Sequence, residues 1–120
     1  MRRKHHDLRL WQESMILVRE IYEATEKFPR DEVYSLTNQM RRAAISVPSN
    51  IAEGAGRMGP KEFLQFLSIA RGSLSELDTQ IILAKDLGYL NDTRNIQNRI
   101  ERIFSLFGGL MNSLKGKVAN

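Results

Sequence analysis

The spacing of apolar residues constrains the fold of this chain more than any other feature. In four segments the apolar side chains recur three and four positions apart, the spacing that lets an α-helix bury one face. No segment offers a β-strand. The pattern therefore predicts an all-α fold. It is clearest in the third segment, at Phe63, Leu67, Ala70, Leu74, Leu77, Ile81 and Ala84.

Turn-forming residues separate the four predicted helices. Pro29 ends the first helix, because proline disfavours helical geometry in the residue before it. Pro60 stands in the first turn of the third helix, where proline is favoured. Gly88 closes that helix, and Asn91 is expected to cap the fourth. The predicted helices cover residues 8–27, 33–55, 60–87 and 92–115.

Short turns between helices of this length favour an antiparallel up-down-up-down four-helix bundle. The chain suits a single domain over residues 1–120, with a basic N-terminal tail over residues 1–7. The first helix carries two adjacent apolar lines, a face wide enough to contact several helices, which favours a bundle and is compatible with an oligomer. One line is Leu8, Trp11, Met15, Val18, Tyr22 and Thr25, and the other is Leu10, Ser14, Leu17, Ile21, Ala24 and Phe28.

Three further expectations concern close packing. Pro48 lies inside the second helix and removes a backbone donor, so we expect a kink there. Gly108 and Gly109 interrupt the apolar line of the fourth helix, and we favour a close helix crossing over the end of the helix. A line of small residues on the third helix would let another backbone come close. It consists of Ser68, Gly72, Ser75 and Thr79.

The composition is that of a soluble globular protein, with 42% hydrophobic and 27% charged residues and a net charge of +4. The absence of cysteine fits a reducing compartment, and the first residues lack the apolar core of a signal peptide, so a cytoplasmic location is expected. The longest aliphatic run, residues 81–84, is far short of the roughly 20 residues that cross a bilayer. No membrane contact is predicted.

Residues that carry chemistry are scarce. His5 and His6 are adjacent in the basic tail, whereas paired helical metal ligands stand three or four apart, so no metal site is predicted. The glycines at 54, 56 and 59 spell G-x-G-x-x-G, but the dinucleotide motif needs a preceding strand, so no cofactor is predicted. No acid, base and nucleophile stand together, and the chain is predicted not to be an enzyme.

A polar stripe runs along the second helix. One interpretation is a solvated face with an ion pair between Glu53 and Arg57. The other is a specific polar interface between helices or subunits, in which Asn50 and Glu53 satisfy groups opened by Pro48. The candidate residues are Gln39, Arg42, Ser46, Asn50, Glu53 and Arg57.

Basic residues concentrate near the two chain ends. They either serve solubility or contact the phosphates of nucleic acid once assembly brings them together. Assembly would multiply the charge of +4, enough to attract a polyanion through counterion release. Aromatic residues do not interleave with them, so base-specific reading is not predicted. The candidate contacts are Arg2, Arg3, Lys4, Arg94, Arg99, Arg102, Lys115 and Lys117.

Three stretches of this chain resemble a known family. They are LWQESMILVREIYEATEKFP, QMRRAAISVPSNIAEGAGR and KEFLQFLSIARGSLSELDTQIILAKDLGYL. Their amino-acid sequences are similar to those of the four-helix bundle proteins encoded in intervening sequences of bacterial 23S ribosomal RNA genes. The matching positions are Trp11, Gln39, Arg41, Arg42, Ser46, Pro48, Asn50, Ala52, Glu53, Gly54, Gly56, Arg57, Glu62, Phe63, Gly72, Ser73, Glu76, Leu77 and Gly88.

The resemblance implies a homopentamer of antiparallel four-helix bundles with no established catalytic residue. Related bundle proteins are accessory factors of diversity-generating retroelements, which implies RNA or DNA, and a protein such as a reverse transcriptase, as possible partners. The favoured hypothesis is a non-enzymatic, oligomeric, nucleic-acid-associated accessory or scaffold protein. The alternative is a protein-interaction scaffold that does not contact nucleic acid.

Overall fold

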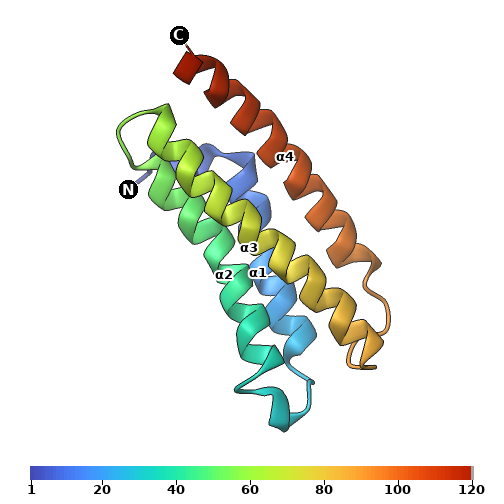
Figure 1. The fold of residues 1–120 in the computed structure, drawn as a ribbon. Helices are drawn as coiled ribbons and strands as arrows, with labels where there is room; N and C mark the ends of the chain where they lie inside the picture. Colours follow the sequence, from blue (N-terminus) through green and yellow to red (C-terminus); the bar gives the residue numbers. More distant parts are fainter. Residues whose placement is uncertain (120) are drawn as a thin grey trace.

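The computed structural model describes residues 1–119, so Asn120, the last residue of the predicted domain, lies outside the described part. Four long helices form an antiparallel bundle in which each helix packs on the next and α4 closes against α1 (Figure 1). The predicted all-α four-helix bundle is confirmed. The elements are η1 (Lys4–Asp7), α1 (Arg9–Thr25), η2 (Arg30–Glu32), α2 (Leu36–Ala55), α3 (Pro60–Asp86) and α4 (Arg94–Ala119).

The core consists of the apolar lines of the four helices. Of the two lines on α1, the one that includes Leu10, Leu17 and Ile21 is buried, because it faces the centre of the bundle. The other line, with Trp11 and Val18, stays partly exposed. The largest fully buried side chains are Phe107, Leu17, Ile21, Met40, Ile51, Leu67, Leu74, Leu77, Ile81, Ile100, Ile103 and Val47.

Helices α2 and α3 share the most extensive contact in the bundle. At Gly54 a Cβ atom would lie 2.6 Å from the Cβ of Phe66 and 3.0 Å from Cδ1 of Phe63, so this position needs glycine for space. Pro48 lies within α2, which stays helical from Leu36 to Ala55. The close approach at Gly54 fixes how the second and third helices meet.

Two of the expected close approaches are wrong within this chain. A Cβ atom at Gly108 or Gly109 would meet nothing within 4 Å, and α4 continues to Ala119, so the glycine pair is neither a crossing nor an end. Gly72 likewise has nothing within 4 Å. The small residues of its line are exposed on α3, because the apolar line of that helix takes the inner face.

The turn between α3 and α4 also differs from expectation. Gly88, at a φ of 82°, ends α3, and the Tyr89 N–H donates to the Ala84 carbonyl. Tyr89 and Leu90 then pack against the core, so the next helix starts later than predicted. Buried Thr93, not Asn91, precedes its first turn, and its carbonyl accepts the N–H of Gln97 at 2.9 Å.

Over residues 1–119, none of the helices combines the length and the apolar character required to cross a bilayer.

Candidate nucleic-acid interface

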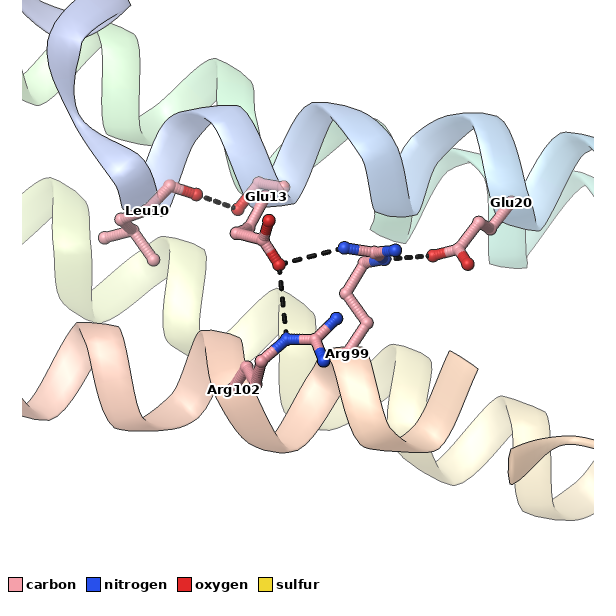
Figure 2. A network of polar contacts seen from close by, with 6 residues as sticks. Leu10, Glu13, Glu20, Arg99 and Arg102 are labelled. Carbon is pink, nitrogen blue, oxygen red and sulfur yellow. Dashed lines mark hydrogen bonds and ion pairs between the residues drawn. The ribbon is translucent and has the colours of Figure 1, made fainter. Parts of the chain in front are cut away.

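Two of the three arginines of α4 that were candidate phosphate contacts, Arg99 and Arg102, are held in ion pairs with α1. Arg99 lies between two carboxylates, with Nη1 2.9 Å from Glu13 and Nε 2.5 Å from Glu20 (Figure 2). Arg102 reaches the same Glu13 carboxylate, at 3.4 Å from Nε. The side chain of Arg99 is only 18% exposed. Its charge is therefore neutralised inside the bundle rather than offered to a ligand.

Arg94, the first residue of α4, is paired as well. Its guanidinium donates to both carboxylate oxygens of Asp92, at 3.0 and 2.8 Å. These side-chain hydrogen bonds hold the pKa of Asp92 well below its usual range. Of these three candidate contacts, Arg99 stabilises the contact between α1 and α4, Arg94 belongs to a turn, and Arg102 keeps a side chain that is 54% exposed.

The other candidate cations gather at one end of the bundle, where both chain termini and the turn between α2 and α3 lie (Figure 1). Lys4 from the N-terminal tail and Lys117 from the end of α4 line a hollow of about 120 Å³ together with Arg57. Arg57 is held in place by Glu53, at 3.0 Å, and lies over the ring of Phe66. Three segments that are distant in sequence thus bring their charges to one place.

We call this region the basic end. Eight Lys and Arg residues stand there against three acids, Asp7, Glu53 and Glu62. Two of the eight are paired, Arg2 with Asp7 and Arg57 with Glu53. Electrostatic attraction of a polyanion depends on such a concentration of one sign of charge. The cations of the basic end are Arg2, Arg3, Lys4, Arg9, Arg57, Lys61, Lys115 and Lys117.

The opposite end has the reverse balance. Six acids stand against four bases in and beside the turns between α1 and α2 and between α3 and α4. The two turns are joined by a hydrogen bond of 2.8 Å from the Tyr89 hydroxyl to Glu32, which raises the pKa of Tyr89. The acids are Glu23, Glu26, Asp31, Glu32, Asp86 and Asp92, and the bases are Lys27, Arg30, Lys85 and Arg94.

A groove between α3 and α4 adjoins the basic end. It has a volume of about 450 Å³, and Lys61, Arg71 and Lys115 stand along it. Apolar and neutral polar side chains complete its lining, and none of the lining residues is acidic. They are Leu64, Gln65, Ser68 and Met111.

The polar stripe of α2 divides into three parts. Ser46 and Asn50 form a bridge to α3: Asn50 Nδ2 donates to the carbonyl and to Oγ of Ser46, each at 2.9 Å, and Ser46 Oγ lies 2.8 Å from Oγ of Ser73. Glu53 pairs with Arg57 on the surface. The stripe therefore contains one interhelical contact and one solvated ion pair.

The remaining stripe residues, Gln39 and Arg42, are exposed. Neither Asn50 nor Glu53 bonds to the carbonyl of Ala44, the group that Pro48 leaves without its helical donor. Asn50 instead donates to Ser46 on α2, and Glu53 accepts from Arg57, which lies just beyond the end of that helix.

An apolar hollow of about 400 Å³ lies between α1 and α2, on the outer side of the bundle. It is lined by the exposed apolar line of α1, including Trp11, Met15 and Val18, and by Ile45 of α2. The ring of His5 stacks edge-on against Trp11, with centroids 5.1 Å apart, and burial lowers the pKa of His5.

In the described part of the chain, no three His, Asp or Glu residues stand close enough together to hold a metal ion.

Sequence analysis missed three cations of the interface, Arg9, Lys61 and Arg71. A signal for the first two was present in the predicted topology. In an up-down-up-down bundle the starts of α1 and α3 lie at the same end as the ends of α2 and α4. Arg9 and Lys61 stand at those two starts, so their place towards the basic end followed from the helix order, with Lys61 beside Lys115 and Arg9 beside Arg102. Arg71 lies three turns into α3 and had no such signal.

Comparison with known proteins bears on the fold and on identity. None of the curated proteins compared with the chain matches it. The sequence profile of the 23S rRNA-intervening sequence proteins matches residues 6–109, from the N-terminal tail through α1, α2, α3 and more than half of α4. Since this match takes in nearly the whole bundle, the chain belongs to the 23S rRNA-intervening sequence protein family.

Proposed function

We propose that this protein is a non-enzymatic, cytoplasmic, homo-oligomeric scaffold that binds the phosphate backbone of RNA or DNA through its basic end. The observation that carries the proposal is the meeting of Lys4, Arg57 and Lys117 from three separate segments around one hollow. Cations held this close repel one another, and a polyanion offsets that repulsion. Their clustering therefore favours an anionic partner over simple solubility.

Assembly strengthens this proposal. The exposed apolar line of α1 and the adjoining Ile45, 41% exposed, form a surface that a second copy would remove from water. In the homopentamer that we propose, each basic end is repeated five times. A polyanion that contacts several copies gains affinity through the high effective concentration of the later contacts.

The test compares two triple variants that remove equal charge from opposite ends. The first is Lys4→Gln with Lys115→Gln and Lys117→Gln, and the second is Lys27→Gln with Arg30→Gln and Lys85→Gln. All six residues are exposed. Binding of labelled RNA and DNA is measured by fluorescence anisotropy at several salt concentrations.

We expect the basic-end variant to lose at least about tenfold in affinity and to have a salt slope smaller by about two to three, since each phosphate contact contributes about 0.7 to 0.9. The far-end variant should bind as the unmodified protein does. Equal losses in both variants contradict the proposal, because they indicate a response to net charge alone.

The alternative function is a protein-interaction scaffold without nucleic-acid contact. The apolar hollow between α1 and α2 favours it, because exposed apolar patches of this kind mark protein contacts. Absence of binding by the unmodified protein, even at low salt, supports this alternative over the first proposal.

A further inference from the structure

We infer that the groove between α3 and α4 holds a single strand of nucleic acid, with Lys61, Arg71 and Lys115 on its phosphates. This inference rests on the proposed function, and it specifies a single strand as the form of nucleic acid that binds beside the basic end.

The charge of the groove supports this assignment. Its three cations come from both walls, two from α3 and one from α4, and no acid is among its lining residues. The groove between α1 and α4 differs, because there Arg9 and Arg102 share the lining with Glu13, which already pairs with Arg102 and Arg99. Of the two grooves beside α4, the one against α3 therefore attracts a phosphate chain more strongly.

The shape of the groove favours one strand over two. Packed helix axes lie about 8–10 Å apart, so the furrow between α3 and α4 is much narrower than a double helix. Along α3, Lys61 and Arg71 are ten residues apart, which corresponds to about 15 Å along the helix axis. A short extended single strand of nucleic acid can span this distance. A duplex would touch only the rim of the groove.

The lining between the cations suits unpaired bases without selecting a sequence. Leu64 and Met111 provide an apolar floor, while Gln65 and Ser68 provide hydrogen-bonding groups. No aromatic side chain lines the groove, so stacking of the kind that strengthens single-strand binding is absent among its lining residues. We expect sequence-tolerant, strongly salt-dependent binding.

A cysteine footprint tests the location. The chain contains no cysteine, so Ser68→Cys places one thiol in the groove, and Ser35→Cys places one at the opposite end of the bundle. Both serines are exposed. The rate of alkylation by iodoacetamide is measured with and without a short oligothymidylate, and with a mixed-sequence duplex of the same length.

We expect the single strand to slow alkylation at position 68 at least about fivefold and to leave position 35 unchanged, with little protection by the duplex at the same salt concentration. In parallel, Lys61→Gln with Arg71→Gln should reduce the affinity for the single strand about tenfold and that for the duplex much less. A Lys27→Gln and Arg30→Gln pair is the control of equal charge.

Each other outcome overturns the inference. If the basic-end variant loses binding but position 68 stays unprotected, the strand lies elsewhere, and the proposed function stands. If position 68 is unreactive before any oligonucleotide is added, another copy of the chain covers the groove. If the unmodified protein binds neither probe, the proposed function fails together with the inference.

Discussion

At the scale of the residue, Arg99 shows how one side chain changes role between sequence and structure. In the sequence it is one of three arginines on a basic helix. In the folded chain two carboxylates from α1 enclose it, and all three side chains are less than a quarter exposed. A partly buried charge of this kind is stabilising only while its partners are present.

Replacing Arg99 is therefore expected to destabilise the bundle. Arg99→Ala leaves Glu20 without a counter-charge and Glu13 with only Arg102, and should lower the free energy of unfolding by about 3 kcal/mol. Urea unfolding at fixed protein concentration measures this loss, with Arg94→Ala, an exposed pair, as the control that changes little. Similar midpoints for the two variants would show that the Arg99 network adds no stability.

Asn50 and Asn95 allow a second comparison between two asparagines. Asn50 donates two hydrogen bonds within the bridge from α2 to α3, whereas Asn95 is exposed. Asn50→Ala should cost about 1 kcal/mol of stability and Asn95→Ala less than about 0.5 kcal/mol. Thermal and urea unfolding measure both, and equal costs would mean that the bridge is not a stabilising contact.

At the scale of the element, glycines of similar appearance in the sequence have different functions in the helices. Gly54 allows α2 to approach α3, whereas Gly72 faces open space in the middle of α3. The sequence could not distinguish them, because both lie in helical segments beside small residues. Only the placement of the neighbouring helix separates a required glycine from a tolerated one.

Alanine substitutions at these two glycines are expected to have opposite signs. Gly54→Ala forces a Cβ atom against the Cβ of Phe66 and should destabilise the protein by about 1–3 kcal/mol. Gly72→Ala meets nothing and should stabilise α3 by about 0.4–1 kcal/mol. Unfolding midpoints measure both. A neutral Gly54→Ala would mean that α2 and α3 can separate slightly without loss.

At the scale of the whole molecule, charge and exposed apolar surface are segregated. The basic end lies at one end of the long axis, the acidic turns lie at the other, and the apolar hollow occupies the side between α1 and α2. This segregation allows copies to associate through the hollow while the basic ends stay accessible.

The oligomeric state provides the matching prediction. Light scattering should give a pentamer mass of about 69 kDa, five times 13.8 kDa. Ile45→Lys places a charge in the apolar hollow and should shift the protein towards the mass of one chain, whereas Val33→Lys, outside the hollow and equally exposed, should not. An unchanged mass for Ile45→Lys would exclude the hollow from the contact between copies.

The sequence by itself determined the helices and the apolar lines from which the core is built. Helical spacing, Pro29, Pro60 and Gly88 act within a few residues, so the class of fold and the order of the helices could be predicted from local rules. The errors at Asn91 and at Gly108 arose where a neighbouring element, not the local sequence, determines the contact.

The tertiary structure alone decided which charges are free. Arg99 is separated from Glu13 by 86 residues and from Glu20 by 79. The residue spacing within α1 or α4 does not predict that these side chains contact one another. The same packing left Lys4, Arg57 and Lys117 together at one end. Helical periodicity is a local property, whereas the pairing of side chains from different helices depends on how the whole bundle packs.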